Sequence, residues 1–368
     1  MSKFQAIRGM NDVLPNEIFL WNKFEKIAKQ LMLQYGYQEI RTPIVENTEL
    51  FLRSIGEVTD VVEKEMYSFP DRHDHKSLSL RPEGTAGCVR AALEHGMLYN
   101  QIQKLWYQGP LFRHERPQRG RTRQFHQLGL EAFGLTSTEI EVELMLISQR
   151  LWRHLEISEH IQLEINTIGC QEARARYRDE LVRYFSKYQN DLDSDSQKRL
   201  SKNPLRILDS KNPMLQEIIA NAPSIHQFLS EKSMGAFNKL TEFLTQLSIP
   251  YNINPRLVRG LDYYNDTVFE WTTNQLGAQS AVGAGGRYDK LAELLGGKPT
   301  PAVGFAIGCE RVVELLKLQH QTSSELNCTD IYFILGGEES SILGLKLAET
   351  LRDNLPYLKI QCHLEQAS

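Results

Sequence analysis

Residues 101–134 have the sequence QIQKLWYQGPLFRHERPQRGRTRQFHQLGLEAFG, and two strand-like runs in it, 101–115 and 123–134, flank a polar segment that contains glycine. This pattern predicts a long antiparallel β-hairpin. Because side chains along a strand alternate between its two faces, Arg113 and Glu115 should share one face of the first strand. One face of the second strand should carry Arg123, Phe125, Gln127, Gly129, Glu131 and Phe133.

The side chains on this predicted face match the chemical groups of ATP. Arg113 offers paired donors to a phosphate, Glu115 accepts from an exocyclic amine, and Phe125 offers a ring on which a purine stacks. A solvent-facing sheet with ordinary cross-strand charge pairs explains the same residues equally well. The hairpin alone therefore leaves two alternatives open, a nucleotide site and a solvated surface.

A second motif, GFAIGCER at residues 304–311, has alternate small residues in a strand and then a helix expected over Cys309–Leu318. Small residues let a ligand approach the strand, and Arg311 would then face a terminal phosphate. The alternative is that these glycines only permit tight packing of the helix on the sheet.

The rest of the first 318 residues predicts an antiparallel sheet with flanking helices, the α+β class. The extended segment Tyr37–Pro43 suits a sheet edge or an interface, because proline cannot donate to a central ladder. A polar stretch with three prolines, 189–224, resembles an insertion. Apolar periodicity predicts helices at 16–34, 138–155, 170–188 and 287–295, and strands at 251–259, 266–273 and 279–283.

The chain is too long for one hydrophobic core, so a second domain is expected. We expect a main domain over 1–318 with a helical insertion at about 170–240, and a polar linker over 319–326. Residues 327–368 predict a strand, a helix and a strand. Roughly 40 residues rarely bury a self-sufficient core, so this fragment should be the start of a larger, incomplete α/β domain.

Composition excludes several classes of protein. Apolar residues make up 41% and charged residues 24%, as in soluble globular proteins. The N-terminal segment lacks the features of a secretion signal, and no apolar run approaches about 20 residues. The five scattered cysteines have neither zinc-site nor disulfide spacing. We therefore expect a cytoplasmic protein with reduced thiols and no membrane association.

No sequence pattern indicates a transition metal held by the protein. His73-Asp74-His75 lies in a polar loop without a third ligand, and His114-Glu115 lacks a second histidine at helical spacing. The segment Gly296–Thr300 also lacks the spacing of a phosphate-binding P-loop. We therefore predict no metal site built by side chains alone.

Five segments carry a resemblance to a known family. Tyr35–Pro43, Phe112–Phe125 and Gly304–Arg311 resemble the three motifs of class II aminoacyl-tRNA synthetases. LVRGLDYYNDTVFE at 257–270 and GAGGRYDKL at 283–291 resemble the two signatures of histidyl-tRNA synthetases. The resemblance covers nearly all of the first 318 residues. It implies a class II catalytic domain, followed by the start of an anticodon-binding domain.

The resemblance also implies roles for the arginines. Arg113 and Arg259 would lie on opposite sides of the ATP α-phosphate and act in catalysis, because fixed guanidinium groups stabilise the charge that builds up there. Glu115 and Phe125 would bind the adenine. Arg311 would bind the γ-phosphate, and Arg121 belongs to the same ATP-binding set. Magnesium would arrive with the ATP phosphates.

Five residues would bind the second substrate, L-histidine. Glu83, Thr85 and Gln127 resemble the groups that hold the ammonium of the amino acid, and Glu131 with Tyr264 would contact the two imidazole nitrogens. Such a polar pocket penalises amino acids that leave these groups unpaired. Tyr263 is expected to pack in the core.

Binding of tRNA(His) is implied less directly, because the formal net charge of −4 does not indicate a nucleic-acid protein. Gln118 and Arg119, in the arginine-rich loop of the hairpin, resemble the family's contacts to the tRNA acceptor end. The insertion is a candidate clamp on the acceptor stem. The motif around Pro43 implies a homodimer.

The function implied is ATP-dependent formation of histidyl-adenylate and transfer of histidine to tRNA(His), with release of AMP and diphosphate. One alternative is the synthetase-like regulatory subunit of ATP phosphoribosyltransferase in histidine biosynthesis. The set of phosphate-binding arginines argues against it, because a regulatory protein has no need of them. Another is an amide-forming ligase on the same fold, which the pair Glu131 and Tyr264 disfavours.

Overall fold

The computed structural model describes residues 4–56, 59–208, 210, 212–277, 281–319, 329–336 and 338–364. They belong to two compact units, Met1–Gln319 and His320–Ser368. Of the expected linker, 319–326, residues 320–326 lie outside the described residues. Each unit is described separately below.

The larger unit is built on a strongly antiparallel sheet, which confirms the predicted α+β class. The six central strands pair antiparallel with one another, and each of the two edge strands pairs in parallel with the central strand beside it. The strands follow in the spatial order β1 (Gln38–Glu39), β5 (Gln103–Phe112), β6 (Gln124–Phe133), β11 (Ala302–Gly308), β10 (Ala281–Arg287), β9 (Asn265–Thr272), β7 (Gln162–Thr167) and β8 (Asn252–Ile253).

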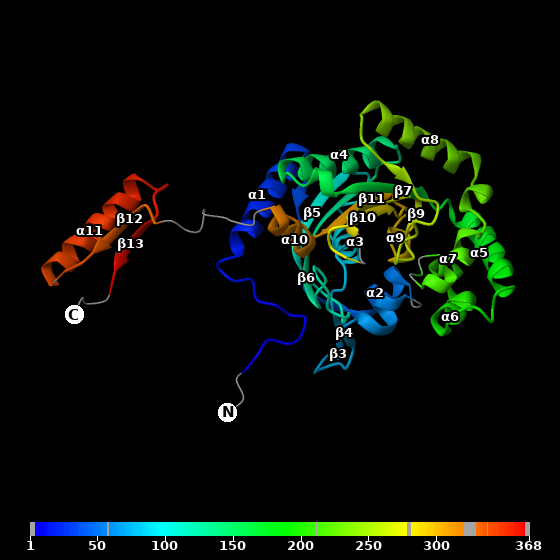
Figure 1. Cartoon of the computed structure of the whole chain (residues 1–368), viewed down its shortest axis with the longest axis horizontal. Helices are drawn as coiled ribbons and strands as arrows, with labels where there is room; N and C mark the ends of the chain where they lie inside the picture. Colours follow the sequence, from blue (N-terminus) through cyan, green and yellow to red (C-terminus); the bar gives the residue numbers. More distant parts are fainter. Residues whose placement is uncertain are drawn as a thin grey trace. The chain divides into compact units, whose positions relative to one another are not determined.

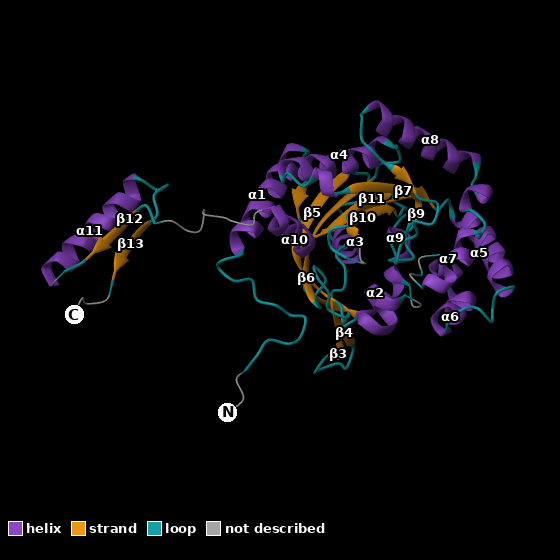
Figure 2. Ribbon diagram, in the orientation of Figure 1, coloured by secondary structure: helices purple, strands orange, loops and turns teal. Residues whose placement is uncertain are grey.

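Three helices cover one face of this sheet, as Figures 1 and 2 show: α1 (Ile18–Gln34), α4 (Glu139–His154) and α10 (Cys309–Gln319). Their apolar residues form the main hydrophobic core with Leu128 and Leu130 of β6. The intervening β6 side chains point to the other face, where α3 (Thr85–Glu94) and α9 (Leu291–Leu294) pack. The sheet is therefore buried on both faces, and the alternation predicted for β6 is confirmed.

A small sheet flanks the large one near α3. It consists of β2 (Val45–Asn47), β4 (Ser77–Leu80) and β3 (Ser68–Pro70), and α2 (Thr48–Ile55) packs beside it. A π-helical turn, η1 (Val61–Glu65), follows α2.

The segment expected to be an insertion is helical. It contains α5 (Gln171–Ser186), α6 (Ser194–Lys202), α7 (Gln216–Ala220) and α8 (Glu231–Gln246), with 3₁₀ turns between them at η3 (Pro204–Ile207), η4 (Pro213–Leu215) and η5 (Ile225–Phe228). Asp193 caps α6 by accepting from the Ser196 N–H at 2.8 Å. Helices α5, α6 and α7 bury a separate apolar core, which includes Tyr177 and Phe185. The buried apolar residues of α8 belong instead to the main core.

Several predicted boundaries were wrong. The helix expected over 287–295 is only α9, because β10 continues to Arg287 and the Asp289 N–H donates to Asn265 Oδ1 at 2.8 Å. Of the strand expected over 251–259, only β8 forms, and Pro255 follows it. The strand predicted at 279–283 begins, among described residues, at Ala281.

The smaller unit has the predicted strand–helix–strand order. It consists of β12 (Ile331–Ile334), α11 (Glu338–Asn354) and β13 (Ile360–His363), and the two strands pair in parallel. Cys328 lies outside the described residues, and Cys88, Cys170, Cys309 and Cys362 are free thiols. In the part of the chain that the structure describes, no helix combines the length and apolarity needed to span a bilayer.

Candidate active site

A cavity of about 340 Å³ lies on the face of the large sheet opposite α1, α4 and α10. The hairpin, the turn before α3, the loop before β9 and the junction of β11 with α10 all contribute to its wall. Ten residues predicted from the sequence line it: Glu83, Thr85, Arg113, Glu115, Arg121, Phe125, Gln127, Arg259, Tyr264 and Arg311. Segments far apart in the sequence therefore meet at one site.

The first strand of the hairpin ends earlier than the sequence predicts. β5 ends at Phe112, so Arg113 and Glu115 lie in the loop rather than on the strand. The Arg113 N–H still donates to the Arg123 carbonyl at 2.8 Å. Its Nε donates to the Pro82 carbonyl at 2.7 Å, and its guanidinium carbon lies 5.4 Å from the centre of the Phe125 ring. The loop therefore holds the guanidinium against the predicted stacking ring.

Buried positive charge accumulates in the cavity. Burial lowers the pKa of Arg113, and nearby Arg259 lowers it further. Burial is also the main cause of the lowered pKa of Arg121, with a contribution from Arg113. Burial and then Arg121 lower the pKa of Arg311 to about 10. Since these cations destabilise one another, the cavity is suited to a ligand with several negative charges.

Carboxylates hold these arginines in place. Arg121 forms an ion pair with Glu115, and Arg259 Nη1 lies 3.0 Å from Glu270 Oε2. The guanidinium carbon of Arg259 also lies 5.9 Å from the centre of the Tyr264 ring. The guanidinium groups of Arg121 and Arg259 are thus oriented before any ligand binds.

Glu83 organises the N-terminus of α3. Its carboxylate accepts from the backbone N–H groups of Thr85 at 2.8 Å and Ala86 at 2.7 Å. Burial raises the pKa of Glu83, whereas these two bonds oppose the rise. Both Glu83 and Thr85 reach the cavity, so a carboxylate and a hydroxyl are available to an ammonium group.

Glu131 lies behind the cavity wall rather than in it. Its Oε1 accepts from the Thr85 hydroxyl at 2.7 Å and the Tyr107 hydroxyl at 3.1 Å, and its Oε2 accepts from the Tyr288 hydroxyl. Burial raises the pKa of Glu131 to about 8, although the hydrogen bonds from Tyr288 and Thr85 oppose this. A ligand that reaches Glu131 therefore meets a carboxyl group whose pKa is close to neutral pH.

Gly304 has a different role from the one predicted. It lies opposite Glu131 in the sheet, and a Cβ at this position would collide with the Glu131 carboxylate. The glycine thus makes room for a side chain rather than directly for a ligand. The next small residues of the motif, Ala306 and Gly308, do line the cavity.

Sequence reasoning missed Tyr107 and the role of Tyr288. Gly84 and Gly129 surround the Tyr107 ring so closely that a Cβ on either would overlap it. A glycine in the middle of a strand, as Gly129 is, signals such close approach and could have led to Tyr107. Tyr263 is buried, as expected, and it also forms part of the cavity wall.

The residues expected to contact tRNA lie outside this cavity. Gln118 pairs through its backbone with Arg121, and it lines a separate pocket beside the N-terminal segment 6–14. Arg119 Nε donates to Glu314 Oε2 of α10 at 2.9 Å. The loop therefore contributes Gly120, Arg121 and Thr122 to the cavity wall, whereas Gln118 and Arg119 lie outside it.

His73, Asp74 and His75 lie in an exposed loop between β3 and β4. Asp74 forms an ion pair with Lys76 at 2.6 Å. Within the described ranges, no group of three or more His, Cys, Asp or Glu side chains is arranged to hold a metal ion.

Comparisons with known proteins agree on one family. A family model described as histidyl-tRNA synthetase matches residues 9–312. The apo histidyl-tRNA synthetase of S. aureus is 34% identical, with a TM-score of 0.79, over 100% of this chain and 86% of that one.

Two more distant structures share the fold. An ATP phosphoribosyltransferase regulatory subunit/histidyl-tRNA synthetase from Bacillus halodurans C is 21% identical with a TM-score of 0.72, over 99% of this chain and 93% of that one. Histidyl-tRNA synthetase from Nostoc sp. PCC 7120 is 19% identical with a TM-score of 0.68, over 100% and 86%. The family match and the S. aureus protein, taken with the arginine-lined cavity, show that this chain belongs to the histidyl-tRNA synthetase family.

Proposed function

We propose that the protein activates L-histidine with ATP and transfers it to the 3′ end of tRNA(His). The observation that supports this most directly is the convergence of Arg113, Arg121, Arg259 and Arg311 on one cavity beside the buried carboxyl group of Glu131. This combination offers donors for a triphosphate and a polar end for an imidazole.

In the first step, a carboxylate oxygen of histidine attacks the α-phosphorus of ATP. The bond from this phosphorus to the bridging oxygen breaks, and diphosphate leaves with the electron pair. Arg113 and Arg259 act in catalysis by stabilising the negative charge on the α-phosphate oxygens. Their guanidinium groups are already held by Pro82 and Glu270, so little reorganisation is needed during the reaction.

The rest of the ATP molecule would follow the cavity wall. Phe125 stacks on the adenine, Glu115 accepts from its amine, and Arg121 and Arg311 bind the terminal phosphates. Magnesium needs few protein ligands, because ATP phosphates and water supply most of its coordination. Glu310 is a wall carboxylate next to Arg311, and its two oxygens already accept from the His126 N–H at 2.9 Å, so the phosphates and water would supply most of the magnesium ligands. The ion would neutralise phosphate charge.

Histidine would bind at the Glu131 end of the cavity. Glu83, Thr85 and Gln127 hold its ammonium group, and Glu131 with Tyr264 recognises the imidazole nitrogens. The Thr85 hydroxyl donates to Glu131, so a hydrogen bond connects a residue that holds the ammonium group with one that recognises the imidazole. Amino acids without an imidazole would leave these buried groups unpaired.

In the second step, a terminal ribose hydroxyl of tRNA(His) attacks the carbonyl carbon of histidyl-adenylate, and AMP leaves. Gln118 and Arg119 would contact the acceptor end, and the insertion would clamp the stem. We assign the smaller unit to an anticodon-binding domain.

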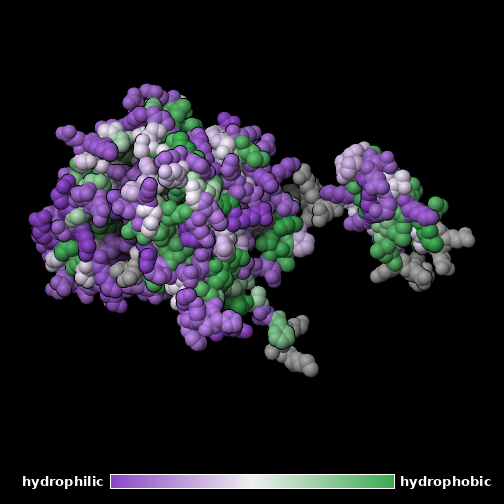
Figure 3. All heavy atoms as spheres, turned by 180° about the vertical axis from the view of Figure 1, so that it is seen from behind, coloured by the Kyte–Doolittle hydropathy of each residue, from purple (hydrophilic) through white to green (hydrophobic). Residues whose placement is uncertain are grey.

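We further propose a homodimer in the cytoplasm. Ile44 and Val45, next to Pro43, are exposed apolar side chains that an interface would cover. Figure 3 shows that apolar patches interrupt an otherwise largely hydrophilic face of the larger unit.

The test is histidine-dependent exchange of diphosphate with ATP. The wild-type protein should catalyse it, and Arg259→Ala should reduce the rate by roughly 100-fold or more, as expected when a charge-stabilising donor is lost. Arg183→Ala is the matched control, because this arginine is exposed on α5 and pairs with Glu180. Near-normal exchange by Arg259→Ala would contradict its catalytic role.

The alternative function, regulation of ATP phosphoribosyltransferase, predicts no exchange by folded wild-type protein. The regulatory subunit/histidyl-tRNA synthetase of Bacillus halodurans C shares this fold, so the fold alone does not distinguish the two functions. Charging of tRNA(His) by the wild-type protein would exclude a purely regulatory role.

A further inference from the structure

The backbone around Tyr264 has an unusual conformation. In the pairing of β9 with β10, Val268 lies opposite Gly286 and Asn265 opposite Arg287, so β9 has two extra residues between these pairs. Within this bulge Asp266 has a φ of 48°, in the left-handed region that non-glycine residues rarely adopt. The bulge directly follows Tyr264, which immediately precedes β9, so the bulge determines the position of the tyrosine relative to the sheet.

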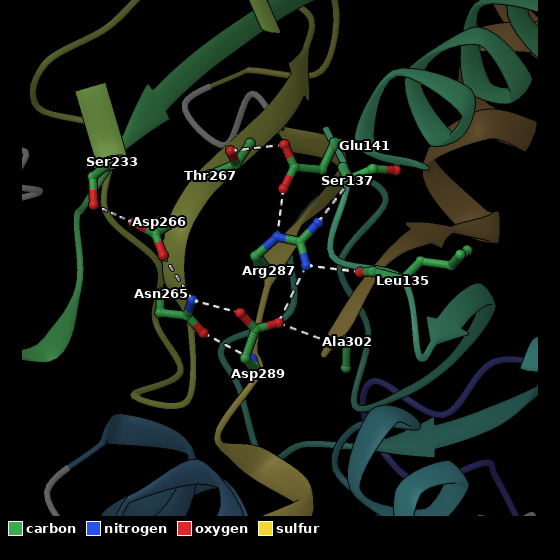
Figure 4. A network of polar contacts seen from close by, with 10 residues as sticks. All are labelled: Leu135, Ser137, Glu141, Ser233, Asn265, Asp266, Thr267, Arg287, Asp289 and Ala302. Atoms are coloured by element: carbon green, nitrogen blue, oxygen red, sulfur yellow. Dashed lines mark hydrogen bonds and ion pairs between the residues drawn. The ribbon is translucent and has the colours of Figure 1, made fainter. Parts of the chain in front are cut away.

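A network of polar contacts connects this bulge to the neighbouring strand and to α4, as Figure 4 shows. Arg287 forms a buried ion pair with Glu141 of α4 at 2.6 Å, and Glu141 also accepts from the Thr267 hydroxyl at 3.0 Å. Asp289 accepts from the Ala302 N–H at 2.9 Å and donates its own N–H to Asn265. These contacts connect both strands that carry the bulge to the core of the larger unit.

Gly286 brings the Tyr264 ring close to β10. A Cβ at this glycine would lie 3.0 Å from Cδ1 of the tyrosine and 2.5 Å from the Thr267 carbonyl oxygen. The ring is therefore packed directly on the backbone of the strand, and a small displacement of the bulge would move it.

The other side of the bulge is held by the helical insertion. Arg174 of α5 donates from Nη1 to the Tyr264 carbonyl at 2.5 Å, and Ser233 of α8 donates to Asp266 Oδ1 at 2.7 Å. The Asp266 N–H donates to the Gly169 carbonyl at 3.0 Å, just before α5 begins. Two helices of the insertion thus contact the turn that carries Tyr264.

We propose that Arg174 and Ser233 are positioning residues, through which the insertion holds Tyr264 in the orientation that binds histidine. Neither side chain lines the cavity, so both act through the bulge. A displacement of α5 or α8 would therefore change the KM for histidine more than the KM for ATP. This inference rests on the proposed function, because that function assigns Tyr264 to the imidazole.

The first experiment compares KM values in the exchange assay. Arg174→Ala should raise the KM for histidine roughly tenfold, as expected for loss of a hydrogen bond from a charged donor, and Ser233→Ala should raise it less. The KM for ATP should change less than about twofold. Arg174→Lys, which keeps a cationic donor, should recover part of the loss.

Arg178→Ala is the matched control, because Arg178 lies one turn further along α5 and donates to the Ser201 carbonyl inside the insertion. It should leave both KM values unchanged. Equal increases in the two KM values for Arg174→Ala would indicate general damage and overturn the proposal, as would an unchanged KM for histidine.

A double-mutant cycle tests whether Arg174 acts through Tyr264. In a Tyr264→Phe background, Arg174→Ala should have little further effect on the KM for histidine, because the hydroxyl that it positions is gone. An effect as large as in the wild-type background would show that Arg174 acts elsewhere.

Calorimetric titration with histidine separates this inference from the proposed function. Absence of exchange in the wild-type protein would contradict the proposed function alone, because the histidine Kd is still measurable. An unchanged Kd in Arg174→Ala and Ser233→Ala would contradict the positioning role, whatever the exchange assay gives.

Discussion

Glu131 concentrates the chemistry of the candidate site in one residue. It is almost completely buried, and three hydroxyl groups donate to it. Burial nevertheless dominates, and it raises the pKa of this carboxyl group from 4.5 to about 8. The free protein therefore holds Glu131 largely protonated at neutral pH, and histidine that needs the carboxylate as an acceptor must compete with this proton.

The pH dependence of histidine activation should follow from this pKa. Between pH 6 and about 8, kcat/KM for histidine should rise as Glu131 ionises, and Glu131→Gln should abolish most of this rise and lower the activity. Exchange rates measured across this range test the prediction. Glu159→Gln, at an exposed carboxylate, is the control. A profile for Glu131→Gln parallel to the wild type would contradict the assignment.

The same shift has a consequence for stability. Because the pKa of Glu131 is higher in the folded protein, the folded state binds more protons than the unfolded state between pH 4.5 and about 8. This carboxyl group therefore lowers the free energy of unfolding progressively as the pH rises through that window, and its contribution is constant above it.

At the scale of elements, contacts between distant segments shape part of the cavity wall. The π-helical turn η1 follows α2, whereas α6 and η3 belong to the insertion more than 130 residues later. Asp60 lies just before η1, and its Oδ2 is 3.3 Å from Arg199 Nη2 and 2.8 Å from Arg206 Nη2. Lys202 Nζ also lies 3.0 Å from Glu63 Oε1. These ion pairs hold the insertion against a segment that lines the cavity.

Asp60→Asn should loosen this contact, because it removes the charge that two arginines share. The amides of 59–65 and 194–207 should exchange hydrogen faster than in the wild-type protein, and added salt should reduce the difference since the pairs are partly exposed. Hydrogen exchange followed by mass spectrometry measures this. Glu180→Gln, whose pair with Arg183 lies within α5, should leave these amides unchanged.

At the scale of the whole molecule, the two units differ in what they contain. All residues of the cavity and the main hydrophobic core lie in Met1–Gln319. In the smaller unit, large apolar side chains such as Tyr332, Ile334, Leu343 and Leu364 are exposed. The larger unit therefore has its own hydrophobic core and should fold by itself.

A protein that ends at Gln319 should keep histidine-dependent exchange within about twofold of the full chain, because a domain with its own core folds independently. Charging of tRNA(His) should fall much further. Both rates, measured alongside circular dichroism to verify folding, test this prediction. Loss of exchange in folded 1–319 would show that the smaller unit contributes to activation.

The sequence by itself determined the α+β class and the hairpin, because strand periodicity is a property of neighbouring residues. Most of the ten residues of the cavity wall followed instead from the resemblance of five segments to a known family. Segments such as 257–270 also carried enough pattern to indicate the family. The same local information placed α1, α4, α5 and α10 close to their observed positions.

Only the tertiary structure decided how these segments combine. It placed Arg113 in a loop, Glu131 behind Thr85, and Tyr107 and Tyr288 around the buried carboxyl group. It also revealed that Arg174 and Ser233 hold the turn of Tyr264. The burial of a side chain, its pKa and its contacts with residues 24 to 157 positions away depend on the packing of the whole unit, and no local pattern contains them.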